Sequence, residues 1–231
     1  MPSLQPVGPG IWIADGEHVS VAGFHYPTRM ALVRLTGGGL FIWSPTALSS
    51  ALQAEVNALG DVHFIVAPNS LHHLFIPQWQ AAYPAAKTIA APGLAARRKD
   101  IAFTAELGET PDAAWANDID QAVVHGNAIT TEVVFFHRAS GTALFTDLLQ
   151  NFRPGTFKGW RGLVAKLDRM TADEPQVLQK FRVAFTDRKA ARLSIRRVLD
   201  WAVQSVLMAH GPIVEKDAAA FLKRAFSWLK V

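Results

Sequence analysis

Cysteine is absent from the 231 residues of this chain, and tyrosine occurs only twice. Without thiols the protein can form no disulfide and can offer no thiolate ligand, so any transition metal would have to bind imidazole or carboxylate groups. No run of about 18 uncharged apolar residues occurs, so we expect no membrane-spanning helix. Residues 1–10 also lack the basic start and apolar run of a secretion signal, and we therefore expect a cytoplasmic protein.

The common glycine-rich motifs of phosphate binding and serine hydrolysis are missing too. There is no Walker loop, no Gly-x-Ser-x-Gly elbow and no Gly-x-Gly-x-x-Gly after a strand, because Gly37-Gly38-Gly39 falls inside an expected hairpin. A half-apolar chain of this length is nevertheless long enough to bury a full core. We expect one domain, residues 1–231.

Charge is unevenly distributed. Residues 1–150 carry 7 Lys/Arg against 12 Asp/Glu, a balance of −5, whereas residues 151–231 carry 16 against 7, a balance of +9. Such asymmetry can mark an anionic partner. The basic residues are spread through amphipathic helical patterns, which favours solvated helix faces, so we do not expect a nucleic-acid partner. The sequence makes no prediction of the oligomeric state.

The first half of the chain alternates strands and helices. Apolar runs predict a hairpin of two strands, a helix capped by Ser44 with Pro45 in its first turn and ended by Gly60, and then a further strand. A second, weaker cycle of helix and strand follows. The predicted strands are 30–35, 40–43, 62–67 and 88–91, and the short second helix is 77–83.

The second half starts with three short apolar runs that predict a small antiparallel sheet, and it ends in helices. The predicted strands are 119–124, 132–137, 143–146 and 206–209; a loop leads into a helix within 151–175, and further helices are 175–185, 188–204 and the segment through Phe221–Leu229. This order predicts an α+β protein, an αββα sandwich of two mixed β-sheets with helices on the outer faces. A doubly wound parallel sheet is the alternative, but alternation of strand and helix is lost between 119 and 146.

Groups that can bind a metal follow three of the predicted strands. His72-His73 follows strand 62–67, Asp147 follows strand 143–146, and His210 follows strand 206–209. Ligands in α/β layers gather at strand ends. We therefore expect these three strand ends to meet at one edge of the sandwich.

At this point the chain resembles the metallo-β-lactamase fold superfamily. The opening Gly8-Pro9-Gly10-Ile11-Trp12-Ile13, the strand ending in Phe145-Thr146-Asp147 and the segment His210-Gly211-Pro212 are similar to segments of that superfamily. A functionally uncharacterised branch of it is similar in more detail, and the segments that carry this resemblance are Arg29-Met30, Trp43-Ser44-Pro45, Ala67-Pro68-Asn69, His72-His73-Leu74-Phe75, Ala91-Pro92-Gly93-Leu94 and Glu132-Val133-Val134-Phe135-Phe136-His137.

The superfamily signature His-x-His-x-Asp-His is degenerate here. Aligning His73 with its last histidine puts His72 at the aspartate, and Pro68 and Ser70 at the first two histidines. A third ligand of the first metal would have to come from His125, one or two positions out of register. An alignment starting at Asn69 is the alternative. The resemblance thus implies a second metal site only, with the ligands His72, His73, Asp147 and His210.

Such a site would hold at most one metal, zinc or iron, or none. We expect Trp43 to be a core residue, Ser44 a helix cap and His137 a structural residue. Two functions follow from the resemblance: a mono-metal hydrolase of an ester, thioester or phosphoester, or a non-catalytic descendant that binds a small-molecule ligand or a partner.

Overall fold

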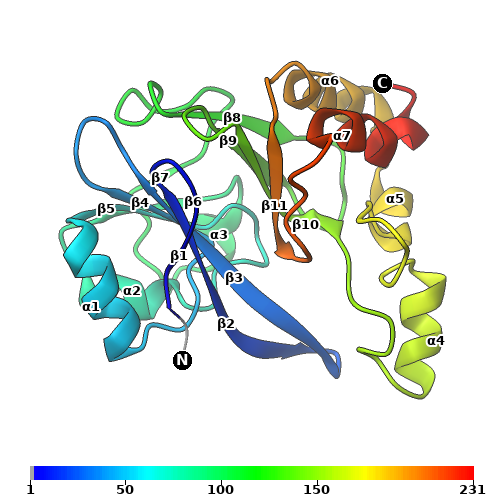
Figure 1. Cartoon of the computed structure of the whole chain (residues 1–231), viewed down its shortest axis with the longest axis horizontal. Coiled ribbons are helices and arrows are strands. Elements are labelled where there is room, and N and C mark those ends of the chain that lie inside the picture. The colour runs from blue at the N-terminus through cyan, green and yellow to red at the C-terminus, as the bar shows by residue number, and fades with distance from the viewer. Residues whose placement is uncertain (1–2) are drawn as a thin grey trace.

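The computed structural model describes residues 3–231. Two β-sheets pack face to face and helices cover both outer faces (Figure 1). This arrangement is the αββα sandwich that the sequence predicts.

The larger sheet has seven strands that lie side by side in the order of the sequence. The first four are antiparallel to their neighbours, and β4 through β7 run parallel. The strands are β1 (Gln5–Gly8), β2 (Ile11–Val21), β3 (Phe24–Arg34), β4 (Leu40–Trp43), β5 (Val62–Val66), β6 (Lys87–Ala90) and β7 (Ala105–Glu106). The parallel strands are joined by helices α1 (Ser50–Leu59) and α2 (Ile76–Ala82), and α3 (Leu94–Arg97) follows β6.

The smaller sheet has the order β11-β10-β9-β8. Strands β8 (Ile119–Val124), β9 (Glu132–His137) and β10 (Thr142–Gln150) are antiparallel, as predicted, and β11 (Ser205–His210) joins β10 in parallel. Helices α4 (Trp160–Leu167), α5 (Gln179–Ala184) and α6 (Arg188–Leu199) lie between β10 and β11 in the chain, and α7 (Ala218–Phe226) and a final turn η1 (Ser227–Leu229) follow β11.

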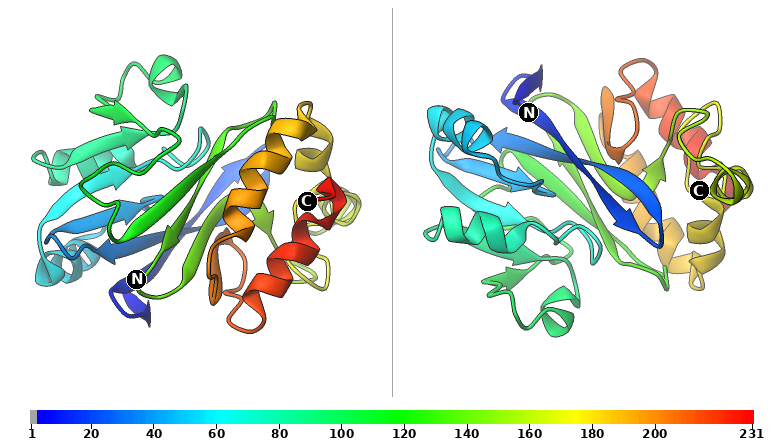
Figure 2. Two further views of the ribbon diagram at one scale, coloured as in Figure 1. Left: turned by 90° about the horizontal axis from the view of Figure 1, so that it is seen from above. Right: turned by 90° about the horizontal axis from the view of Figure 1, so that it is seen from below.

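Alternation of apolar side chains builds the layers, because successive residues of a strand point to opposite faces. In β9, Val133 and Phe135 point between the sheets, whereas Val134 and Phe136 pack under α6 and α7. Strands of the larger sheet do the same, with one set of side chains between the sheets and the other under α1 and α2. Figure 2 shows the resulting sandwich from above and below.

Two predicted helices differ from the observed ones. The helix predicted at 188–204 ends at Leu199, because Gln204 and Ser205 already donate backbone hydrogen bonds to Gly141 at the start of the smaller sheet. The helix predicted at 175–185 shrinks to α5, since Gln176 pairs with Gln150 in a β-bridge.

Ser44 is not a helix cap, which corrects the sequence prediction. Helix α1 begins at Ser50, and Ser49 is the residue whose hydroxyl accepts a hydrogen bond from the Leu52 N–H at 3.1 Å. Ser44 instead adopts a left-handed backbone conformation, with φ of 52°, directly after β4. This backbone turn leaves its hydroxyl available to the site described below. Trp43 is buried between the sheets, as predicted.

Candidate functional site

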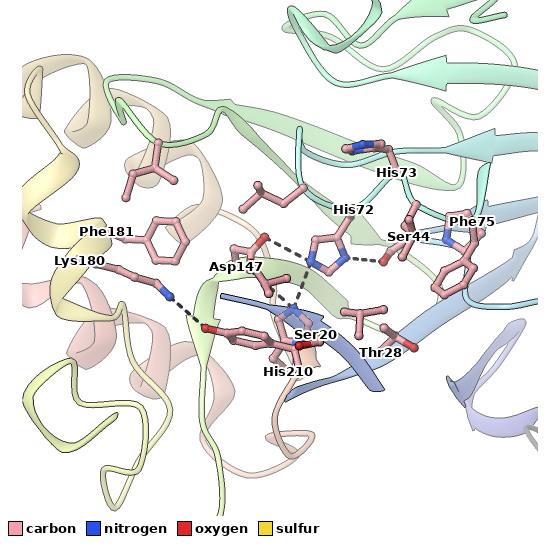
Figure 3. A pocket seen from close by; sticks show the side chains of 17 residues that line it. Ser20, Thr28, Ser44, His72, His73, Phe75, Asp147, Lys180, Phe181 and His210 are labelled. Carbon is pink, nitrogen blue, oxygen red and sulfur yellow. Dashed lines mark hydrogen bonds and ion pairs between the residues drawn. The ribbon is translucent and has the colours of Figure 1, made fainter. Parts of the chain in front are cut away.

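His72 in the loop after β5, Asp147 on β10 and His210 at the end of β11 lie together, with one ligating atom from each residue within 4.8 Å of the others. His72 Nε2 is 3.2 Å from His210 Nε2 and 3.2 Å from Asp147 Oδ2, and His210 Nε2 is 3.7 Å from Asp147 Oδ1 (Figure 3). Two imidazole nitrogens and one carboxylate therefore converge on one point. We refer to these three residues as the His/Asp group.

His72 is held by the loop that follows β5. The Asn69 side-chain oxygen accepts hydrogen bonds from the backbone N–H groups of Leu71 and His72, at 2.8 and 2.9 Å. Such a side-chain turn fixes the backbone as a helix cap does. Because Asn69 is fully buried, the position of His72 is tied to the core.

Asp147 lies inside β10, at a point where the pairing of this strand with β11 shifts register. The Asn69 amide donates to its Oδ2 at 2.7 Å, and the Gln150 amide donates to its Oδ1 at 3.0 Å. Asn69 thus orients two members of the His/Asp group at once, His72 through the backbone and Asp147 through the side chain.

A second carboxyl group, that of Glu132, lies beneath Asp147. Its two oxygens accept hydrogen bonds from the backbone N–H groups of Thr146, Asp147 and Leu148, at 2.8, 2.8 and 3.1 Å. Burial and the nearby Asp147 charge raise the pKa of Glu132. We infer that Glu132 is structural: it takes up the donors that the irregular part of β10 leaves without strand partners.

The His210 ring presents Nε2 to the site because its other nitrogen is engaged. Nδ1 lies 2.7 Å from the carbonyl oxygen of Pro27 on β3, and a carbonyl can only accept, so Nδ1 carries the proton. Tyr26 and Phe152 flank the ring with centroids at 5.6 and 6.3 Å. In the neutral ring, Nε2 then holds a free lone pair directed at the group.

His72 is oriented in the same manner by Ser44. Its Nδ1 lies 2.8 Å from the Ser44 hydroxyl, which is 3.3 Å from the Arg29 carbonyl oxygen. If the hydroxyl donates to that carbonyl, it accepts from Nδ1–H of His72 and leaves Nε2 as an acceptor. Both imidazoles can therefore offer a lone pair to the same point.

The charge state of the group favours cation binding. Burial and the neighbouring His72 lower the pKa of His210 to about 4, so that its ring is neutral near pH 7. Burial acts to raise the pKa of Asp147, but the two histidines and the Asn69 amide outweigh it and hold this pKa well below the usual range. A neutral imidazole beside an ionised carboxylate is the form in which these side chains bind metals.

His73, the fourth predicted ligand, is not in the His/Asp group. Its ring points away from Asp147 and His210 (Figure 3), and burial, followed by the nearby Arg98, lowers its pKa. Its Nδ1 is buried without a hydrogen-bond partner among the described residues. The structure therefore brings together three of the four predicted side chains.

The remaining histidines with predicted roles lie elsewhere. His125 pairs with Glu109 at 2.5 Å at an exposed position, and its ring is absent from the His/Asp group. His137 is buried and bonds through Nδ1 to the Ser140 hydroxyl at 2.8 Å, which fits its predicted structural role.

A pocket of about 520 Å³ opens over the His/Asp group, and His72, Asp147 and His210 all line it. Most of its other lining is apolar and comes from the β2–β3 hairpin, the loop after β5, the β8–β9 loop and α5, including Val19, Val21, Tyr26, Leu71, Leu74, Phe75, Ile129 and Phe181. Lys180 is the only Lys or Arg among the lining residues, which all belong to the described part of the chain. Its Nζ is 3.7 Å from Asp168 and 5.6 Å from the centre of the Tyr26 ring.

Reasoning from the sequence did not identify the residues that support the group. Asn69 entered only as an alternative first ligand, and Glu132 only as part of a resemblance. A signal for Glu132 was present: it directly precedes the apolar run Val133–Phe136 of a strand whose residues are all buried, and a carboxyl group in such a position needs partners. The carbonyl of Pro27 gives no sequence signal, since it depends on backbone position alone.

Within the described chain, no helix is long and apolar enough to cross a membrane. The sequence matches the family model described as "Domain of unknown function (DUF4336)" over residues 10–156. No curated protein matches it.

Comparison with solved structures shows that this chain has the metallo-β-lactamase fold. A metallo-β-lactamase from Pontibacter korlensis superposes with a TM-score of 0.65 at 13% identity, covering 100% of this chain and 99% of that one. The metallo-β-lactamase FIM-1 from Pseudomonas aeruginosa, in its mono-zinc form, gives 0.63 at 12% identity, with 100% and 96% covered. The Flv1 flavodiiron core from Synechocystis sp. PCC6803 gives 0.66 at 10% identity, with 99% and 61% covered.

Proposed function

The chain belongs to the DUF4336 family, and we propose that it is a hydrolase that holds a single metal ion at the His/Asp group. The observation that supports this proposal is the convergence of two imidazole Nε2 atoms and one carboxylate. In each ring the other nitrogen, Nδ1, is within hydrogen-bond distance of a protein oxygen, the Pro27 carbonyl or the Ser44 hydroxyl. Catalytic zinc sites use three protein ligands of this kind and keep a further position open.

His72, Asp147 and His210 would be the ligands, and the donor set suits zinc or ferrous iron. A metal held there would polarise a substrate oxygen and lower the pKa of water towards neutrality. In this proposal Asn69, Ser44 and the Pro27 carbonyl orient the ligands through the contacts described above, and the apolar walls of the pocket would exclude bulk water. His73 lies outside this set of ligands.

The walls of the pocket favour a carboxylic ester or thioester of an apolar acid over a phosphoester. Phosphoryl groups are recognised by clusters of Arg and Lys. Only Lys180 is available in this pocket, and Asp168 already lies next to it. Several aliphatic and aromatic side chains could instead enclose an acyl chain.

Metal content tests the proposal directly. Protein purified without chelator or added metal should contain about one zinc or iron ion per chain by elemental analysis, and a chelator should lower its melting temperature, because a ligand that binds only the native state stabilises it. His72→Ala should lose both the metal and the chelator effect. His73→Ala is the matched control: the neighbouring histidine lies outside the group, so this variant should keep both.

Hydrolysis of aryl esters and thioesters of short and medium-length apolar acids should depend on the metal in the same manner. Wild-type protein that shows no chelator effect after incubation with zinc or iron would overturn the hydrolase proposal, and it would favour the non-catalytic alternative. Equal metal loss in the His72 and His73 variants would contradict the ligand set.

A further inference from the structure

Helix α4 carries its apolar side chains on the side that faces solvent. Trp160, Leu163, Val164 and Leu167 are 59%, 61%, 41% and 70% exposed, although their spacing of three and four residues is the one that usually faces a core. Ala165, on the opposite side of the helix, is its buried residue. A contiguous apolar stripe exposed in this manner usually marks a binding surface.

Cations surround this stripe. Lys158, Lys166 and Arg169 are exposed, and Arg161 stacks its guanidinium over the Trp160 ring at 4.8 Å. The acidic residue next to the helix, Asp168, is engaged by Lys180, whose backbone N–H donates to it at 2.7 Å. The surface around the stripe is therefore positively charged.

The tip of the β2–β3 hairpin extends this surface. Phe24 contacts the Trp160 ring edge to face, with centroids at 5.7 Å, and Gly23 lies against the Arg161 guanidinium. Val21, at the same tip, is 58% exposed. Figure 1 shows the hairpin and α4 at the same end of the molecule. We call the residues Val21, Trp160, Leu163, Val164 and Leu167 the docking face.

We propose that the docking face binds the surface of an anionic lipid bilayer. Amphipathic helices with Trp and Leu on one face and Lys and Arg beside it insert their apolar side into the boundary between headgroups and acyl chains. Tryptophan favours that boundary, and each Lys or Arg near an anionic surface strengthens the attraction to it. Apolar stripe, tryptophan and cations all occur together on α4.

A second copy of this chain fits the same face less well. Symmetric pairing would bring the cations of the two copies together, because an isologous interface places the same patch on both sides. Protein interfaces are also depleted of lysine at their core. The positive border of the docking face complements anionic lipid instead.

Bilayer binding has a consequence for the pocket. Val21 belongs both to the docking face and to the lining of the pocket over the His/Asp group. The mouth of the pocket would then lie near the acyl chains of the bilayer. Binding itself does not depend on a metal, so it can be tested apart from the hydrolase proposal.

Cosedimentation with vesicles tests the inference. The full chain should bind vesicles of phosphatidylcholine mixed with phosphatidylglycerol, bind phosphatidylcholine alone at least about tenfold more weakly, and be released at high ionic strength. The double variant Leu163→Glu/Leu167→Glu should lose about tenfold or more in affinity, because it removes two apolar anchors and adds repulsion. The matched control is Val183→Glu/Leu193→Glu, which changes two residues that are 70% and 58% exposed on α5 and α6 and should bind like wild type.

Three results would overturn the inference: no binding of the wild type to the anionic vesicles, equal binding by the two double variants, or equal binding to neutral and anionic vesicles. Sedimentation velocity adds a fourth. A wild-type dimer that becomes a monomer only in Leu163→Glu/Leu167→Glu would assign the face to a second copy of the chain. Circular dichroism melts of each variant confirm that it is folded.

Discussion

A single hydrogen bond decides what His210 can do. Because the Pro27 carbonyl can only accept, it fixes the proton of the neutral ring on Nδ1 and leaves Nε2 directed at His72 and Asp147. Burial, and then the neighbouring His72, keep the ring from taking a second proton. The protonation of His210 therefore affects the pH dependence of stability as well as the site.

The stability of the metal-free protein should fall as the pH is lowered. The pKa of His210 drops from 6.5 in the unfolded chain to about 4 in the native state. Below pH 6.5 the unfolded chain takes up a proton that the native state does not, so the free energy of unfolding decreases until the pH reaches the native pKa. The loss from this one group is about 3 kcal/mol.

Urea unfolding in the presence of chelator, at about pH 7 and about pH 4.5, measures this loss. His210→Asn is the comparison, because its amide can still donate to the Pro27 carbonyl but does not titrate. Its stability should fall less than that of wild type over the same interval. Equal losses in the two proteins would show that His210 does not carry the pH dependence.

At the scale of single residues, the sequence predicts types of group better than their geometry. His72, Asp147 and His210 follow apolar runs of the sequence and were identified for that reason, although β10 continues past Asp147 and β11 includes His210. His73 was included because two histidines in a loop can turn to one centre, and its direction depends on the Asn69 turn, which no periodic pattern reveals. Ser44 was predicted as a cap because Ser-Pro favours helix starts, yet its backbone turns out of β4 towards His72.

At the scale of elements, Arg29 joins the two sheets next to the site. From β3 its Nη1 donates to the carbonyl oxygens of Met208 and Gly211, at 2.9 and 2.6 Å, while Nε pairs with Asp15 at 2.6 Å. The two carbonyl groups that accept these hydrogen bonds lie on either side of His210 in the sequence, at the end of β11. Arg29 therefore holds the element that supplies one member of the His/Asp group.

Arg29→Lys should loosen the end of β11. A lysine cannot reproduce the planar arrangement of donors, so we expect a loss of about 1–3 kcal/mol in the free energy of unfolding, from carbonyl groups left without donors. Metal affinity should fall by about 10–100-fold, as it does when groups that orient ligands are removed. Chemical unfolding and competition with a metal indicator measure the two effects.

Arg34→Lys provides the control for this variant. Arg34 is the last residue of the same strand and donates to the Leu59 carbonyl at 3.1 Å, without a contact to β11. Metal affinity should not change in it. A similar drop in both variants would indicate that β3 as a whole, and not the contact with β11, sets the affinity.

Element prediction succeeded where apolar residues alternate or repeat and failed where tertiary contacts override them. The strand pattern of β4, β5, β8 and β9 is strongly apolar and was predicted closely. Strands β1 and β2 were not predicted, because β2 carries Asp15, Gly16, Glu17 and His18 in its middle and is held by pairing with β3 instead. The loop leading into a helix within 151–175 was predicted, but not that the apolar stripe of this helix would face solvent.

At the scale of the whole molecule, the three apolar layers form a continuous stack. One layer lies between the sheets, and the other two lie under the helices of each outer face. The sandwich could be predicted from the order of strands and helices together with the family resemblance. The convergence of β5, β10 and β11 on one site could only be expected in outline, because these strands belong to different sheets.

We propose that residues 1–231 unfold as one domain, because the layer between the sheets includes residues from both. Phe135 of β9 is 1% exposed and contacts Phe41 of β4 with ring centroids at 5.6 Å. Phe135→Ala should therefore lower the free energy of unfolding by about 3–5 kcal/mol. Near-UV and far-UV circular dichroism should report a single coincident transition in both wild type and variant.

The control variant is Leu193→Ala, at a position 58% exposed on α6, which should change the free energy of unfolding by less than about 0.5 kcal/mol. Two separate transitions, only one of them moved by Phe135→Ala, would mean that the two sheets unfold independently.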